Sequence, residues 1–439
     1  MAMQGVEDSD RERRFDEYIG LLGDTLHHAD RQQPFRNYVT GLLLPGERKS
    51  VEPMAARIAP SRVSAEHQSL LTFVSESSWD EVTFLDAVAE QVLPVLTADD
   101  GVTAWIVDDT GFPKKGKHSV GVSRQYCGEL GKKENCQVAV SLSVATEHAS
   151  LPIAYRLYLP EDWSLDEEKR KKTKVPSDMT FHTKPDIALD QIWDAVARGL
   201  APGVVLADPA YGNNTDFRDG VTALGLVYAM GIQFTTTVWP PGAGPLPPVS
   251  WSGRGRPPTA LRRDAEHQPI SVKALALGLG AQVWQTVSWR EGTNEDLKGR
   301  FTRLRVRPAH RDEKRSEPRP EEWLLIEWPD GEEAPTKYWL STLPDNIAMA
   351  ELVRVTKMRW RIERDYRELK QELGLGHFEG RGWRGFHHHA ALCIAAYGFL
   401  VRERIAFPPC TDRGSPGIKA SAVPTGYRPR GSAGTARAA

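Results

Sequence analysis

Cysteine is scarce in this chain of 439 residues, which contains four: Cys127, Cys136, Cys393 and Cys410. Because none of them forms a CxxC pair, the sequence predicts neither a disulfide framework nor a common zinc module. Long apolar runs are missing too, since no stretch approaches the roughly 18 residues that a membrane helix needs. The acidic start lacks the apolar segment of a signal peptide. These absences exclude a membrane-spanning or disulfide-rich protein, and we expect a cytoplasmic one.

A large net charge is also missing. The chain has 56 Lys and Arg residues against 58 Asp and Glu residues, for a formal net charge of -2. This balance excludes a protein that is basic over its whole surface, but it is compatible with a local basic groove. At roughly 150 residues per domain, the length suggests about three folding units.

Residues 1–98 are expected to form a helical, DNA-binding domain. Apolar residues recur at three- or four-residue spacing within 15–26, which indicates an amphipathic helix. Ser78 stands three residues before Glu81, the arrangement of a capping box at a helix start. The basic segment 46–62 is compatible with a helix-turn-helix contact to DNA or, equally, with a solvated surface.

Residues 99–231 have the pattern of a mixed α/β fold, with Val-rich runs, a helix and a further strand. The charged run 161–174 is expected to be a solvated loop. A β-rich insertion domain is expected over 232–345, and 346–405 return to the core, where 346–373 are predicted to form one long helix. We expect the Gly-, Pro-, Ser- and Ala-rich tail, residues 406–439, to be disordered.

Acidic residues stand at positions that suit metal binding. Asp109 and Asp208 each lie where an apolar strand gives way to a turn, and ligands of open α/β sheets bind at such strand ends. A turn-forming or capping role is the alternative for each aspartate. On the predicted long helix, Arg359, Glu363 and Lys370 share a narrow stripe, for which surface ion pairing is the alternative.

Together these residues meet the needs of two-metal phosphoryl transfer. Two Mg²⁺ ions about 3.5–4 Å apart require several converging carboxylates. Asp109, Asp208 and Glu363 can supply them, while Arg359 and Lys370 can bind DNA phosphates through charge-assisted hydrogen bonds.

The segment RWRIERDYRELK (359–370) resembles the signature around the catalytic glutamate of bacterial insertion-sequence DDE transposases of the Y-R-E-K branch. Arg359, Glu363 and Lys370 match the R, E and K of that motif, whereas Thr356 stands at the tyrosine position. Segments 108–140 and 207–214 resemble those that carry the family's first two aspartates. With the segments 46–57 and 374–392, the match points to the insertion sequence 701 group.

The resemblance implies an α/β, RNase H-like (retroviral-integrase-like) core with a mixed sheet, interrupted by the β-rich insertion. It implies that Asp109, Asp208 and Glu363 bind two Mg²⁺ ions, with Mn²⁺ as a substitute. Asp109 is favoured as the first ligand because the family's aspartate directly precedes the threonine, and Asp108 is the alternative. Arg359 and Lys370 would orient the DNA.

The resemblance further implies a transposase that binds the terminal inverted repeats of its own element, cleaves double-stranded DNA and joins it to a target. Such a protein would act as a homodimer on the bacterial nucleoid. Lys114, Lys115 and Lys117 lie in a basic hairpin and are predicted to bind DNA, with a solvated hairpin as the alternative. Two rival functions stay open: a catalytically decayed transposase that only binds DNA, and an RNase H-like structure-specific nuclease.

Four tryptophans of the insertion are candidates for stacking on a flipped base, although core packing is the simpler role for each. They are Trp284, Trp289, Trp328 and Trp339.

Overall fold

The computed structural model of the protein describes residues 2–290 and 296–408. The tail that the sequence predicts to be disordered therefore lies almost entirely outside the described residues. The last described helix, α14 (Trp383–Ala406), includes the first residue of that predicted tail.

The described strands form one 12-stranded mixed sheet with the order β2-β3-β1-β5-β6-β12-β11-β10-β7-β8, while β4 pairs with β3 and β9 with β10. Strands β1, β5 and β6 are parallel neighbours. The strands are β1 (Ala104–Pro113), β2 (Ser123–Cys127), β3 (Lys132–Ala145), β4 (Ser150–Leu157), β5 (Val204–Ala207), β6 (Tyr228–Ile232), β7 (Thr237–Trp239), β8 (Ile270–Ser271), β9 (Gln285–Arg290), β10 (Leu297–Pro308), β11 (Glu322–Trp328) and β12 (Lys337–Ser341).

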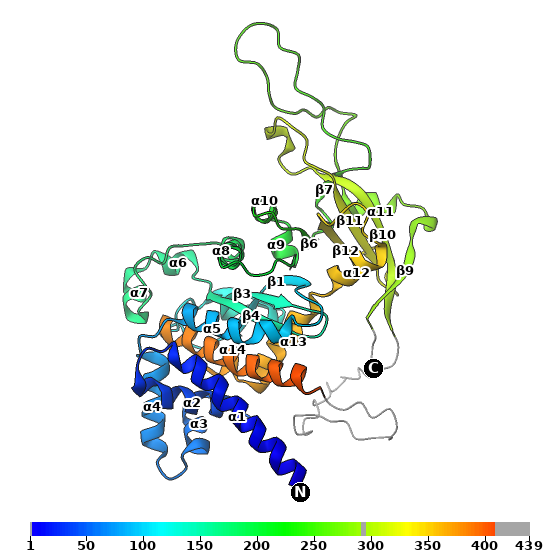
Figure 1. Ribbon diagram of the computed structural model, residues 1–439. Coiled ribbons are helices and arrows are strands. Elements are labelled where there is room, and N and C mark those ends of the chain that lie inside the picture. Colours follow the sequence, from blue (N-terminus) through cyan, green and yellow to red (C-terminus); the bar gives the residue numbers. More distant parts are fainter. Residues whose placement is uncertain (1, 291–295, 409–439) are drawn as a thin grey trace, which may run out of the picture.

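Strands β9 to β12 lie within the β-rich insertion predicted over 232–345, and they continue the sheet of the preceding segment. Strand β12 pairs antiparallel with β6, with Leu340 opposite Met230. One sheet therefore runs from the region of the predicted core into the region of the predicted insertion, as Figure 1 shows.

The helices predicted within residues 1–98 are present. They are α1 (Ala2–Asp24), α2 (Ala29–Leu43), α3 (Val51–Ile58), α4 (Val63–Ser75) and α5 (Glu81–Leu96). Helix α14 packs against α2, α4 and α5 on one side and against β4 on the other. Because α14 is buried along nearly its whole length, it joins the N-terminal helices and the sheet into one hydrophobic core.

Two local predictions are wrong. The N-cap of α5 is Asp80, whose carboxylate accepts a hydrogen bond from the Thr83 backbone N–H at 2.7 Å, so the expected capping box at Ser78 does not form. An aspartate directly before the helix is as good an acceptor as a serine and lies closer to its first turn. The charged run 161–174 forms two short helices instead of a loop, α6 (Glu161–Ser164) and α7 (Glu167–Thr173).

The single long helix predicted over 346–373 is also wrong. The segment divides into α12 (Met349–Lys357), α13 (Trp360–Arg367) and a π-helical turn, η4 (Glu368–Glu372). At the break, the Met358 N–H donates to the Val355 carbonyl and the Arg361 N–H donates to the Met358 carbonyl, each at 3.0 Å. These tighter three-residue bonds redirect the chain, so that α12 packs on β9 while α13 packs on β1 and β4.

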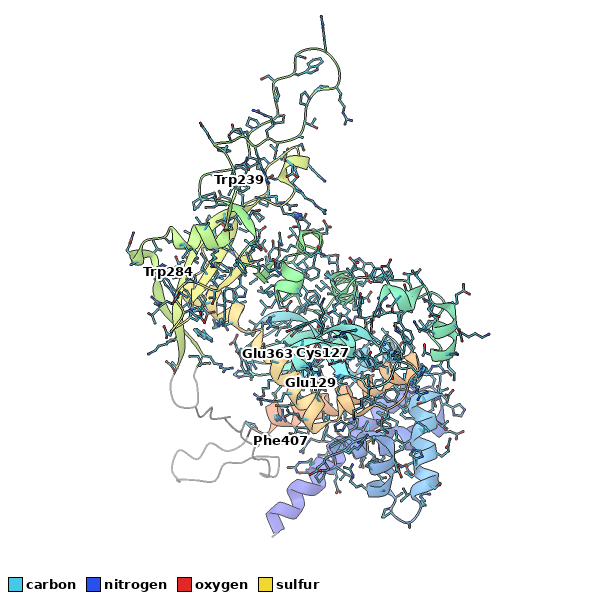
Figure 2. All side chains as sticks on the ribbon, turned by 180° about the vertical axis from the view of Figure 1, so that it is seen from behind. Cys127, Glu129, Trp239, Trp284, Glu363 and Phe407 are labelled. Carbon is cyan, nitrogen blue, oxygen red and sulfur yellow. The ribbon has the colours of Figure 1, made fainter. Side chains whose placement is uncertain are left out.

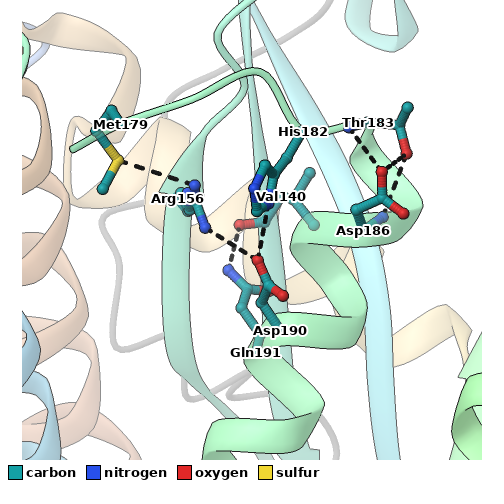
Figure 3. A network of polar contacts seen from close by, with 8 residues as sticks. All are labelled: Val140, Arg156, Met179, His182, Thr183, Asp186, Asp190 and Gln191. Atoms are coloured by element: carbon teal, nitrogen blue, oxygen red, sulfur yellow. Dashed lines mark hydrogen bonds and ion pairs between the residues drawn. The ribbon is translucent and has the colours of Figure 1, made fainter. Parts of the chain in front are cut away.

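Helix α8 (Lys184–Ala197) lies on the opposite side of strands β1, β3 and β4 from α14 (Figure 1). Its start has a capping box between Thr183 and Asp186. Gln191 donates to the Val140 carbonyl of β3 at 3.1 Å, as Figure 3 shows. The capping box fixes the first turn of α8, and Gln191 holds the middle of the helix against the sheet.

Two more helices follow β5: α9 (Pro209–Gly212) and α10 (Thr215–Ala223). A short helix, α11 (Val272–Leu277), follows β8. Among the described residues, no helix is long and apolar enough to cross a membrane.

The turn after β5 depends on a close backbone contact. A Cβ atom at Gly212 would lie 1.9 Å from the Gly231 carbonyl oxygen of β6. Because backbone atoms cannot yield, Gly212→Ala should lower the free energy of unfolding by about 2 kcal/mol or more. Chemical denaturation followed by tryptophan fluorescence would measure the loss.

Gly20→Ala is the matched control, since a Cβ at Gly20 in α1 meets nothing within 4 Å. Alanine is the better helix former, so this variant should gain up to about 1 kcal/mol. Equal stability of the two variants would contradict the assigned contact.

Candidate active site

Asp108 lies on β1, and Asp208 directly follows the neighbouring parallel strand β5 as the N-cap of α9. The register pairs Ile106 of β1 with Leu206 of β5, and each aspartate stands two residues beyond its member of that pair. Since side chains two residues apart point to the same face, both carboxylates lie on one face of the sheet. Ile106 and Leu206 pack on that face with Ile362 of α13.

Arg359, the residue before α13, links this pair to Glu363. Its guanidinium lies 3.0 Å from Asp108 Oδ2 and 2.9 Å from Glu363 Oε1. The break between α12 and α13 places Arg359 at this position. The Asp108 side chain is 14% exposed and the Glu363 side chain 64% exposed. Arg359 thus pairs with one buried acid and one exposed acid, and its charge also acts on Asp208.

Burial and like charge govern the protonation of this site. Burial raises the pKa of Asp108 to about 7, with the neighbouring charges of Asp208 and Asp109 adding to the rise and Arg359 opposing it. Burial also raises the pKa of Asp208, against the charge of Arg359 and the Ala210 backbone N–H. Burial lowers the pKa of Arg359, but the charges of Asp108, Glu363 and Asp208 outweigh it and the net shift is upward.

Asp109, which the sequence favoured, is close enough for its charge to raise the pKa of Asp108 and Asp208, but its side chain has other partners. Its Oδ2 pairs with Lys184 Nζ at 3.0 Å and accepts a hydrogen bond from the Tyr211 hydroxyl at 3.3 Å. Lys184 is the first residue of α8, so Asp109 faces α8 rather than α13. No sequence pattern points to Lys184 or Tyr211, except that Tyr211 stands three residues after Asp208.

Tyr366 is a second residue near the site that the sequence did not reveal, and it contacts the backbone of Asp108. Its hydroxyl lies 2.7 Å from Ser141 Oγ and 3.3 Å from the backbone carbonyl oxygen of Asp108. The sequence pattern did not reveal this role of Tyr366, because a periodicity does not show what a buried hydroxyl contacts.

The lysines predicted to bind DNA differ in whether their ammonium groups already have partners in the protein. Lys370 Nζ lies 2.7 Å from the Gly111 carbonyl and 2.6 Å from Glu129 Oε2. Lys114 Nζ donates to the Phe378 carbonyl at 2.9 Å, and burial lowers the pKa of Lys114. Two further predicted residues are exposed: Lys115 and Lys117.

Part of the basic segment 46–62 serves the fold itself. Lys49 is buried and donates to the carbonyls of Leu42 and Leu44, and burial lowers its pKa to about 8. Arg57 donates to the Pro45 carbonyl. In this conformation both side chains close the end of α2, which argues against direct contact with DNA.

The four candidate tryptophans are half-buried rather than free to stack. Lys357 Nζ lies 4.4 Å from the Trp289 ring centre and 5.8 Å from the Trp339 ring centre. The rings of Trp284 and Trp328 contact each other edge to face at 5.2 Å. Of the two roles considered for these tryptophans, packing is the one that matches their contacts in the structure.

The carboxylates suit a divalent cation in chemistry but are not gathered around one position. Among the described residues, no three His, Cys, Asp or Glu side chains stand close enough together to hold a metal ion. Asp108 and Asp208 provide the hard oxygen ligands that Mg²⁺ prefers. Arg359 supplies the positive charge between Asp108 and Glu363, so a cation fits here only if Arg359 moves. Figure 2 labels Glu363 on its helix.

The raised pKa of Asp108 makes stability depend on pH. Its folded-state value of about 7 exceeds the ordinary 3.8, so the protonated form favours folding below about pH 4. That contribution is lost as the pH rises to about 7. The Asp108→Asn variant has no carboxyl group at this position and does not lose this contribution. Its free energy of unfolding minus that of the wild type should therefore increase as the pH rises from about 4 to about 7. Urea titrations in metal-free buffer at several pH values would measure it, and a pH-independent difference would contradict the assignment.

Comparisons with known proteins agree with the motifs. The family model described as DDE superfamily endonuclease matches residues 21–296, more than half of the chain. A protein of Microchaete diplosiphon named "Probable transposase for insertion sequence element IS701" is 30% identical over 219 residues. That match spans 50% of this chain and 53% of the relative, about half the length of each.

These matches confirm the resemblance that the motifs predicted. Asp108 and Asp208 lie inside the segment matched by the family model, whereas Glu363 lies beyond it. Because the family model matches more than half of the chain, the chain belongs to the DDE superfamily of endonucleases.

Proposed function

We propose that this protein is a DNA transposase that cleaves the ends of its own mobile element and joins them to target DNA. One observation carries the proposal: Asp108 on β1 and Asp208, directly after the parallel strand β5, lie toward the face where Arg359 joins Asp108 to Glu363. Two-metal phosphoryl transfer requires such carboxylates to converge, which in this site requires Arg359 to leave its place between Asp108 and Glu363. The relative's name supports the same reaction.

We assign the first carboxylate to Asp108 instead of Asp109. Adjacent residues of a strand point to opposite faces, so only one of the two can share a face with Asp208 and Glu363. Asp109 keeps a supporting role, because its ion pair with Lys184 anchors the start of α8 beside the site.

Asp108, Asp208 and Glu363 would hold two Mg²⁺ ions, or Mn²⁺ in their place. When bound, such ions activate the attacking water or 3′-hydroxyl and stabilise the leaving oxygen. The chain's own contribution is positioning. Glu363 is free to turn toward the aspartates because most of its side chain is exposed, and Arg359 would exchange Asp108 for a DNA phosphate.

In this proposal the core has an RNase H-like arrangement, formed by residues 99–231 and 346–405. The β-rich insertion, residues 232–345, and the helical residues 1–98 would contact the terminal inverted repeats. Lys115 and Lys117 would bind phosphates as they stand, and Lys114 and Lys370 after they leave their present partners. Two copies of the chain would hold paired transposon ends.

Plasmid cleavage tests the assignment with a matched pair of variants. Purified protein is incubated with Mg²⁺ and a plasmid carrying the DNA that flanks its gene, and cut positions are mapped. Asp108→Asn and Glu363→Gln should each lower the cleavage rate more than about a hundredfold, since even outer partners of metal ligands affect activity by about ten- to a hundredfold. Asp109→Asn should retain most of it.

The other outcomes select the rivals. Binding to the element ends without cleavage, equal in wild type and Glu363→Gln, would indicate a decayed transposase that only binds DNA. Cleavage of branched DNA without regard to the flanking repeats would indicate a structure-specific nuclease. Loss of cleavage in Asp109→Asn but not in Asp108→Asn would return the first carboxylate to Asp109.

A further inference from the structure

A proline-rich arm projects from the end of the sheet between β7 and β8 (Figure 1). Its foot is held firmly. The buried carboxylate of Asp312 accepts hydrogen bonds from the Trp239 indole and from Arg263, each at 2.5 Å. Leu246 and Arg262 pair across the arm through two backbone hydrogen bonds of 2.8 and 2.9 Å. Figure 2 labels Trp239 at this foot.

The tip of the arm is open on all sides. Every residue from 249 to 260 is exposed. The Trp251 indole N–H donates to the Gly255 carbonyl at 3.2 Å, which shapes the tip into a turn. Gly253 and Gly255 have φ values of +84° and +75°, and a Cβ at either would meet nothing within 4 Å. The glycines therefore serve the backbone conformation and keep the tip narrow.

The charge of the tip is of one sign. Residues 240–263 contain four arginines, seven prolines and no acidic residue. Arg262 and Arg263 are used at the foot, where they bond to Pro247 and Asp312. Among the described residues, Arg254 and Arg256 have no hydrogen bond or ion pair, whereas most of the other arginines do. Two uncompensated guanidinium groups at the end of a stiff arm point to an anionic partner.

The shape of the tip selects among anionic partners. The minor groove of B-DNA is about 6 Å wide and too narrow for a helix. A chain of Gly-Arg-Gly-Arg-Pro-Pro can enter it, because only the arginines carry long side chains. A narrow A·T-rich minor groove has an enhanced negative potential that attracts arginine, and arms with two arginines are a known means of reading it. The minor groove of double-stranded RNA is wide and shallow, which fits this tip poorly.

We propose that the arm binds DNA in the minor groove of A·T-rich sequence, with Arg254 and Arg256 inserted. This inference rests on the proposed function, in which the protein acts on DNA. It assigns a second DNA contact to the arm, separate from the catalytic carboxylates. The arm adds affinity at A·T-rich sites while the carboxylate face acts on the strand.

Binding without catalysis tests the proposal. The full-length protein is titrated, in EDTA, with two fluorescent duplexes that differ only in a central AATT or GGCC tract. Arg254→Ala/Arg256→Ala should weaken binding to the AATT duplex by at least about tenfold. It should also reduce the slope of log affinity against log salt by about 2. Netropsin, which fills A·T minor grooves, should abolish the difference between wild type and variant.

Lys171→Ala/Lys172→Ala is the charge-matched control. It removes the same charge from two exposed lysines of α7, far from the arm in Figure 1, and should leave the AATT preference intact. An equal loss on both duplexes by the arginine variant would overturn the groove assignment in favour of phosphate contacts.

The failures of the two proposals are distinguishable. An arginine variant that binds both duplexes like wild type, in a protein that still cleaves plasmid DNA, would overturn the arm's role and leave the proposed function standing. A wild-type protein that binds neither duplex and cleaves no DNA would overturn both.

Discussion

The ion pair of Arg359 with Asp108 and Glu363 is the interaction on which the site depends. The parallel strands β1 and β5 bring Asp108 and the following Asp208 to the same face of the sheet, where burial raises both of their pKa values and the charge of Asp109 adds to each rise. A positive charge must offset this cost if both acids are to ionise at neutral pH. Arg359 supplies that charge in the protein alone, and a divalent cation is proposed to supply it when DNA is bound.

The surrounding fold serves this exchange of counter-charges. The break between α12 and α13 sets Arg359 against β1, and Tyr366 holds the backbone of Asp108 from the same helix. On the other face, Lys184 at the start of α8 neutralises Asp109. Each of the two adjacent aspartates thus has its own cation on its own side of the sheet, so that only Asp108 has to be released for binding a metal ion.

Much of this arrangement could be predicted from the sequence, because periodicity reports which residues share a face. The N-terminal helices, the strands around Asp208 and the β-type runs after residue 280 follow from such patterns. The choice between Asp108 and Asp109 could not, since the turn predicted after Asp109 does not form there. Both aspartates lie inside β1, which continues to Pro113, and the pairing of Ile106 with Leu206 decides which of them faces Glu363. The helix break at Met358 lacks a Gly or Pro signal, and Lys184 is 75 residues from Asp109 along the chain.

Crystals of the protein soaked in Mn²⁺ would test the central claim most directly, because anomalous diffraction locates the ion without assumptions about catalysis. The account predicts Mn²⁺ between Asp108 and Asp208, with the Arg359 side chain displaced from Asp108. Mn²⁺ bound by Asp109 on the α8 side, with the pair of Arg359 and Asp108 intact, would contradict it.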